Sequence, residues 1–202
     1  MRVALIAVVG LAACGKNPLL ARVDGQTLPE CDQSVAAADG PNFSFGLRDR
    51  EDQMQLPKGP VVRIAADRSV SWRRIKMVAD RIRKQGSRPV YLCGVGVTDK
   101  VAAFEPTETL HPGKHLVFDA GNEGDFFVAK GDDKGTEVHA MDHEHIAKSF
   151  IRETLGPLVS ESGIHDVEVR ADPHIEWADL VRAVDGSRTC CGETPMRASL
   201  IE

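Results

Sequence analysis

Two segments of this chain share residues at one constant spacing, and this internal repeat restricts the fold more than any other feature. The first segment covers residues 61–82 and the second covers residues 166–185. The residues that coincide at a separation of 105 positions are Val62 with Val167, Ala66 with Ala171, Asp67 with Asp172, Trp72 with Trp177, and Asp80 with Asp185. Apolar character is also kept between these identities. The pattern predicts a duplicated supersecondary unit.

Each copy reads as a strand followed by a helix. In the first copy, residues 61–65 are apolar enough for a buried strand, and Ser71 is a good N-cap for the helix that follows. The apolar positions Ile75, Val78, Ala79 and Ile82 follow helical spacing, so one face of this helix should meet a sheet. Gly86 should end the helix, and residues 89–97 read as a second buried strand. We therefore expect a crossover that returns parallel.

The second half contains more elements than the first. Residues 115–119 and 125–129 are predicted to form a hairpin, and Asp142 to cap a helix over 143–160, in which Pro157 favours a kink or an early end. The expected buried face of that helix is Ala147, Phe150, Ile151, Thr154 and Leu158. The expected order ends with a strand over 167–171, a helix over 177–184 and a strand over 196–201.

These patterns predict an α+β fold made of two small repeated strand-helix-strand units. The second unit is the fuller one, with the order hairpin, helix, strand, helix, strand. The predicted boundaries are a signal peptide over 1–13, a first, degenerate unit over 14–97, a linker over 98–113 and a second unit over 114–202.

The amino terminus has the features of a bacterial lipoprotein signal. Arg2 supplies a minimal positive region, and residues 3–12 form an apolar run too short for a transmembrane helix, which needs about 20 residues. The run ends in Leu-Ala-Ala before Cys14, so we expect Cys14 to be lipidated. The alternative is a plain secretory signal. Gly15 after the cysteine favours the outer membrane over the inner one, on the periplasmic side of the cell envelope.

The repeated segments resemble the periplasmic domain of the ExbD/TolR family of biopolymer transport components. The residues that carry the resemblance are Val62–Asp67 through Ile82 with Val90–Leu92 in the first copy, and Val167–Asp172 through Val184 in the second. Members of this family have a transmembrane helix with a buried aspartate, which this chain lacks, so their energy-coupling role does not carry over. The resemblance implies dimer formation, peptidoglycan contact or binding to envelope proteins. Two linked copies would imitate the family's dimer within one chain.

Four cysteines remain beyond Cys14, and an even number in an exported chain indicates disulfide bonds. They are Cys31, Cys93, Cys190 and Cys191. Three connectivities are available. A bridge between the adjacent Cys190 and Cys191 would be strained, so we expect each to pair elsewhere. The alternative for this pair is a thiol-active role.

The densest group of metal-ligating side chains is His139, Asp142, His143 and His145. Three histidines could hold zinc, but their spacing does not match an established motif, and we favour a polar loop with a helix cap. We expect Asp67 and Asp172 to cap turns rather than to form a hydrolytic pair. Trp72 and Trp177 should belong to the core. No catalytic residue and no cofactor are predicted.

The net charge of −5 and the scattered basic residues exclude nucleic acid as an expected partner. The helix of the first copy is strongly basic, and it presents either a solvated face or a docking face for an anionic polymer or acidic partner. Its basic residues are Arg73, Arg74, Lys76, Arg81, Arg83 and Lys84. The sequence thus predicts a non-enzymatic, lipid-anchored envelope protein with a binding or scaffolding role. The alternative is a metal-binding envelope protein that uses His139, His143 and His145.

Overall fold

The computed structural model describes most of the chain beyond its amino terminus. The described residues are 20–32, 35–50, 53–96, 98–106, 112–131, 135–138, 145–192 and 196–201. Within these ranges the fold is α+β, with two five-stranded sheets, a small hairpin and three helices. Cys14 and the proposed signal peptide lie outside the described residues.

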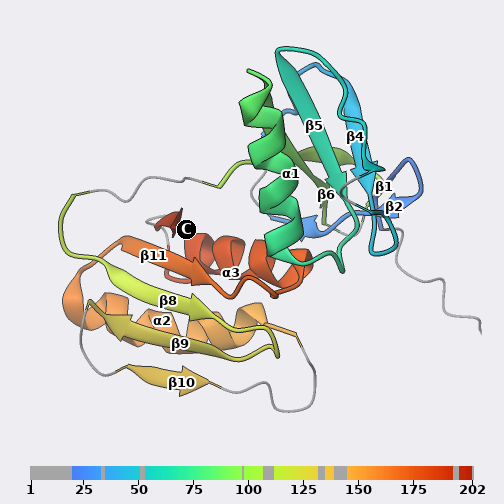
Figure 1. The fold of residues 1–202 in the computed structure, drawn as a ribbon. Helices are drawn as coiled ribbons and strands as arrows, with labels where there is room; N and C mark the ends of the chain where they lie inside the picture. The colour runs from blue at the N-terminus through green and yellow to red at the C-terminus, as the bar shows by residue number, and fades with distance from the viewer. Residues whose placement is uncertain are drawn as a thin grey trace, which may run out of the picture.

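The first sheet contains the predicted parallel crossover. Its strand order is β3-β6-β5-β4, formed by β3 (Glu30–Cys31), β6 (Arg88–Val95), β5 (Val61–Ala66) and β4 (Asn42–Phe45). Strands β5 and β6 are parallel, and α1 (Trp72–Lys84) connects them and packs on them (Figure 1). The hairpin β1 (Arg22–Val23) and β2 (Gln26–Thr27) precedes this sheet.

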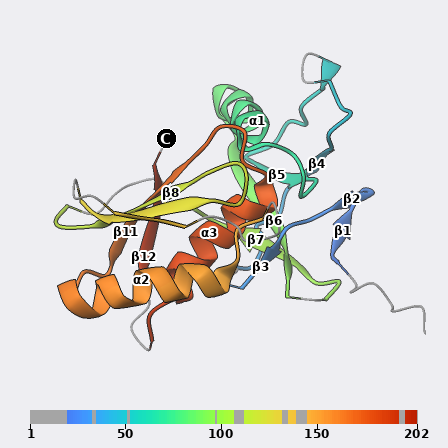
Figure 2. The same ribbon diagram turned by 90° about the horizontal axis from the view of Figure 1, so that it is seen from below.

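The second sheet has the order β10-β9-β8-β11-β12. Its strands are β8 (Leu116–Ala120), β9 (Phe126–Lys130), β10 (Thr136–Val138), β11 (Asp166–Ala171) and β12 (Arg197–Ile201). The predicted hairpin is confirmed in β8 and β9, while β11 is parallel to both of its neighbours. Helices α2 (Lys148–Ser162) and α3 (Trp177–Thr189) lie together on one face of this sheet (Figure 2).

The repeated segments have identical element bounds at the separation found in the sequence. Strands β5 and β11 each contain 6 residues and helices α1 and α3 each contain 13, and both pairs are offset by 105 positions. The geometric match does not extend to the strands that follow, β6 and β12, which differ in length and spacing. Ancestral duplication of the whole unit stays a prediction.

The two segments contact each other through reciprocal backbone hydrogen bonds. The Trp72 N–H donates to the Ile175 carbonyl (2.9 Å), and the Trp177 N–H donates to the Val70 carbonyl (2.8 Å). The next pair repeats the exchange: Arg73 N–H to Pro173 O is 2.8 Å, and Ala178 N–H to Arg68 O is 2.9 Å. Each bond maps onto its partner by the same 105-residue offset, so the contact has the self-complementary form of a twofold interface.

This exchange explains how the two helix N-termini are satisfied. The first amides of a helix have no partner within the helix. Here the first two amides of α1 bond to the turn before α3, and the first two of α3 bond to the turn before α1. Ser71 is the N-cap residue, as expected, but its side chain makes no capping hydrogen bond. The expectation that the Ser71 side chain caps the helix is therefore wrong. The first amides of α1 donate instead to backbone carbonyls of the other segment.

The aromatic residues of the repeat meet at this contact. The rings of Trp72 and Trp177 are stacked, with centroids 5.9 Å apart and an interplanar angle of 12°. Tyr91 and Phe104 pack against Trp177 at 5.5 and 5.6 Å. Both tryptophans are buried, as predicted, and one continuous apolar core includes residues of both sheets. Burial of aromatic surface thus holds the two segments together.

Two sequence expectations about boundaries are wrong. The predicted linker over 98–113 contains a strand, β7 (Val101–Phe104), which pairs antiparallel with β6. Helix α2 begins at Lys148, after an extended Ala147, and continues through Pro157 to Ser162. Its buried residues are Ile151, Leu155 and Val159, so of the predicted buried face only Ile151 is fully buried. A four-residue strand carries too little periodicity to be seen without its partner.

None of the helices within the described ranges is long and apolar enough to cross a membrane.

Candidate functional site

A groove of about 670 Å³ opens beside the contact between the two segments. We call it the junction groove. It is lined by Trp72, Arg73 and Lys76 of α1 and by Glu168, Arg170, Ala171, Pro173 and His174 of β11 and the turn after it. The wall from α1 approaches β11 because the reciprocal hydrogen bonds place the first turn of α1 against residues 173–175. The site is thus a direct consequence of the contact between the copies.

Positive charge dominates the lining of the junction groove. Arg73 is exposed, and Arg170 retains a side-chain exposure of 52%. The one acidic side chain, Glu168, is buried and bound from two sides, by Arg170 Nε at 2.6 Å and by His115 Nε2 at 3.0 Å. Its charge is therefore compensated within the protein by Arg170. The groove combines cationic side chains with the edge of a buried tryptophan, which suits an anionic ligand with some apolar surface.

The equivalent surface in the other copy is closed. Arg73 and Lys76 correspond by the 105-residue offset to Ala178 and Val181, which are 2% and 0% exposed. Arg170 corresponds to Ala65, which is fully buried. Ala65 lies in a small apolar cluster with Ala21, Leu28 and Leu92, so the amino-terminal segment covers that position. The two related surfaces therefore differ at these positions: Ala65, Ala178 and Val181 are buried, whereas Arg73, Lys76 and Arg170 line an open groove.

A smaller, acid-lined pocket of about 360 Å³ adjoins the junction groove and shares Arg170 and Ala171 with it. Its lining includes Asp119, Asp125 and Asp172. Burial raises the pKa of Asp119, and the nearby Arg170 guanidinium acts in the opposite direction. The two cavities together place the cationic side chains of α1 and β11 next to the carboxylates of Asp119, Asp125 and Asp172.

The turn before each helix is organised as the sequence predicted. Asp67 Oδ1 accepts a hydrogen bond from the Ser69 N–H (3.1 Å), and Asp172 Oδ1 accepts one from the His174 N–H (2.6 Å). These are Asx-type turns at equivalent positions. Their capping role is confirmed, and the structure keeps the two carboxylates in separate turns.

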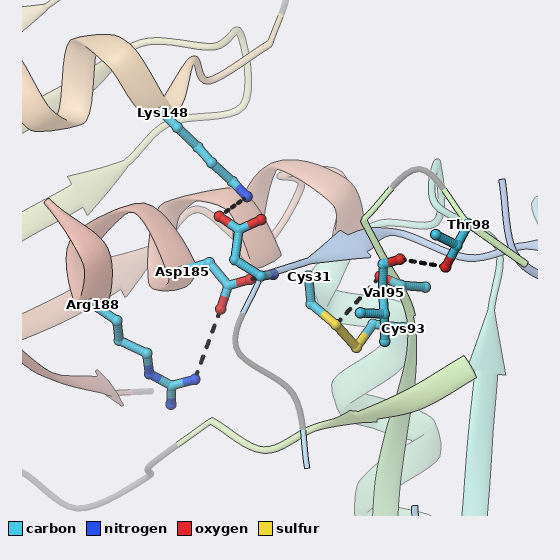
Figure 3. The surroundings of a disulfide bond; sticks show 9 residues. Cys31, Cys93, Val95, Thr98, Lys148, Asp185 and Arg188 are labelled. Carbon is cyan, nitrogen blue, oxygen red and sulfur yellow. Dashed lines mark hydrogen bonds and ion pairs between the residues drawn. A yellow bond between two sulfur atoms is a disulfide. The ribbon is translucent and has the colours of Figure 1, made fainter. Parts of the chain in front are cut away.

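The structure joins the four cysteines in two bridges. Cys31 is bonded to Cys93, with their Cα atoms 5.9 Å apart, and Cys190 is bonded to Cys191, with their Cα atoms 3.7 Å apart (Figure 3 shows the first bridge). The expectation that Cys190 and Cys191 pair elsewhere is wrong. Strand β3 runs parallel to β6 with Cys31 opposite Val95, which places Cys31 beside Cys93 and leaves the adjacent pair only each other.

A cluster of charged residues around the buried Asp185 lies next to this first bridge (Figure 3). Asp185 is fully buried; its Oδ2 accepts the Asp32 N–H at 2.6 Å, and its Oδ1 lies 4.0 Å from Arg188 Nη1. Lys148 in turn binds the Asp32 carboxylate at 2.6 Å. Burial raises the pKa of Asp185 to about 6, against the lowering effects of the Asp32 N–H, Lys148 and Arg188. Burial also lowers the pKa of Arg188.

Sequence reasoning did not identify this cluster. Asp185 was noted only as the counterpart of Asp80 in the repeat. Its helical spacing from Ala178 and Val181 places it on their buried face, and that pattern could have indicated it. The cluster ties the segment around β3 to α3, and so joins the two halves of the molecule.

The predicted histidine group is only partly placed. His139 and His143 lie outside the described residues, whereas His145 lies just before α2. Its Nδ1 atom is 3.1 Å from Asp179 Oδ2 and 4.0 Å from Glu176 Oε2. The structure therefore brings His145 together with two acidic residues that the sequence analysis did not consider as ligands.

Comparison with known proteins yields no match: no protein-family model fits the chain, and no curated protein or solved structure is significantly similar to it. The resemblance to the ExbD/TolR family therefore depends on the quoted residues of the repeat alone.

Proposed function

We propose that this chain is a lipid-anchored cell-envelope protein that binds an anionic ligand in the junction groove and acts as a scaffold rather than as an enzyme. The observation that carries the proposal is the difference between the two related surfaces. In the first copy the amino-terminal segment covers the position of Ala65, whereas the junction groove, lined by Arg73, Lys76 and Arg170, is open. The alternative, that the basic residues of α1 only contact water, does not account for the groove between α1 and β11.

Peptidoglycan is the ligand that best fits this arrangement in the proposed compartment. Its peptide stems carry carboxylates, which suit the cationic wall of the junction groove. They also carry amino groups, which suit the carboxylates of the adjoining pocket around Asp119 and Asp172. The resemblance to the ExbD/TolR periplasmic domain supports the same choice, since peptidoglycan contact is among the roles it implies.

The test is co-sedimentation of the purified full chain, held in a mild detergent, with isolated peptidoglycan sacculi. We compare Arg73→Glu with Lys84→Glu. Both are exposed cationic residues of α1, but only Arg73 lines the groove. Both substitutions change the net charge equally.

We expect saturable binding that Arg73→Glu weakens by about tenfold, which is roughly the effect of losing one charge-assisted contact. Lys84→Glu should bind like the parent. Equal weakening by both substitutions would show a general charge effect and would refute the groove. Absence of sacculus binding by the parent would refute the choice of ligand.

A further inference from the structure

Three metal-ligating side chains converge at the point where α2 and α3 begin. They are His145, Glu176 and Asp179, and one donor atom of each lies within 4.8 Å of the other two. Glu176 is the N-cap residue of α3, and Asp179 lies in its first turn. The equivalent positions of the first copy are Ser71 and Arg74, so the cluster belongs to the second copy alone.

The buried member of the cluster is held in a fixed orientation. The Asp179 side chain is 2% exposed, and its Oδ1 accepts a hydrogen bond from Arg182 Nη1 at 2.5 Å. Its other oxygen, Oδ2, faces His145. A carboxylate bound through one oxygen by a neighbouring cation presents the other in a defined direction, as outer-shell partners do at metal sites. Arg182 also compensates one of the two negative charges.

The donor spacing is close to what a metal ion requires. Ligands at about 2.0–2.2 Å from a tetrahedral zinc lie roughly 3.3–3.6 Å from one another. The observed distances from His145 Nδ1, 3.1 Å to Asp179 and 4.0 Å to Glu176, lie on either side of this range. The third pair of donors, on Glu176 and Asp179, lies within 4.8 Å. His145 and Glu176 are 46% and 39% exposed, which leaves access from solvent.

We propose that His145, Glu176 and Asp179 form a binding site for a divalent transition metal of the zinc class. One imidazole and two carboxylates are a donor set that such ions accept, and with three protein ligands a coordination position stays open. A simple histidine–aspartate hydrogen bond accounts for the contact with Asp179, but it does not require Glu176. The site shares His145 with the group predicted from sequence and differs from it in the other two ligands.

The test is calorimetric titration of the full chain, carrying Cys14→Ser and stripped with a chelator, with zinc ions alone. We compare Glu176→Gln and His145→Gln with His165→Gln, which removes an imidazole outside the cluster. Glu176→Gln keeps the side chain's size and leaves the buried Asp179–Arg182 pair intact, so the fold should be preserved.

We expect a one-to-one zinc complex in the parent and in His165→Gln. Both cluster substitutions should weaken zinc binding by more than about tenfold, since even outer-shell changes commonly cost about 10–100-fold. Absence of zinc binding in the parent, or binding that survives both cluster substitutions, would overturn the proposal. Sacculus binding is measured without zinc, so failure of either proposal is recognised separately.

Discussion

Replacement of the buried Asp185 by asparagine should change how the stability of the protein depends on pH. The carboxyl has an ordinary pKa of 3.8, and burial raises its pKa in the folded protein to about 6. Below about pH 3 the group is protonated in both the folded and the unfolded state. Between about pH 4 and 6 the unfolded chain releases its proton while the folded chain keeps it. The free energy of unfolding therefore falls as the pH rises through this window.

The size of this effect follows from the shift of about two pKa units. Each unit corresponds to about 1.4 kcal/mol, so ionisation of Asp185 should lower the free energy of unfolding by roughly 3 kcal/mol above pH 6. Asparagine cannot ionise, but its side-chain oxygen can still accept the hydrogen bond from the Asp32 N–H. Its amide group would face Arg188, which adds a constant cost at every pH. The informative quantity is therefore the difference in free energy of unfolding between variant and parent, and how this difference changes with pH.

The measurement is urea unfolding at pH values from 4 to 7.5, followed by tryptophan fluorescence with the disulfides intact. Relative to the parent, Asp185→Asn should gain roughly 2.5 kcal/mol in free energy of unfolding over this range, because part of the effect is already present at pH 4. Asp80→Asn is the matched control, because Asp80 occupies the equivalent position in α1, pairs with Arg83 at 3.0 Å and is 44% exposed. Its difference from the parent should stay nearly flat. A flat or falling difference for Asp185→Asn would refute the assignment of a buried, destabilising charge.

Two further substitutions test the core and the first disulfide. Replacing Cys31 and Cys93 together by serine opens a bridge with a sequence separation of 62 residues. The chain-entropy relation gives a loss of roughly 4 kcal/mol in the free energy of unfolding. Urea unfolding measures this loss, and an unchanged midpoint would contradict a formed bridge. Trp177→Ala should lose about 3–5 kcal/mol in the free energy of unfolding, because this ring is 1% exposed and contacts three other aromatic rings. Trp177→Phe should lose less, and equal losses in the two variants would contradict ring packing as the cause.

The elements that could be predicted are those whose signal is local. Strands β5 and β11 and helices α1 and α3 combine apolar periodicity with turn residues, and their positions were anticipated within a few residues, apart from the late end of α3. Strands β3 and β7 were missed because their few residues carry no periodicity, and only pairing with β6 defines them. The Cys31–Cys93 bridge was hidden for the same reason, since its geometry depends on the register of a two-residue strand.

The residues of the candidate sites could likewise be predicted only in part. The basic residues of α1 were noted from sequence, but the opposite wall of the junction groove, around Arg170, comes from a strand about 100 residues away. His145 was noted, but Glu176 and Asp179 read as ordinary residues of a helix start. Side chains that converge only through tertiary structure leave no spacing signal in one sequence.

The twofold form of the contact and the asymmetry of its surroundings together favour a binding role for this region. An isologous contact between identical subunits would create two equivalent grooves. In this chain the two segments differ where they flank the contact, so that Ala65 and Val181 are buried while Arg170 and Lys76 line a groove. The shared hydrogen bonds and stacked tryptophans provide the stability that both copies need. Because the amino-terminal segment covers the position of Ala65, the open groove lies on one side of an otherwise symmetric contact.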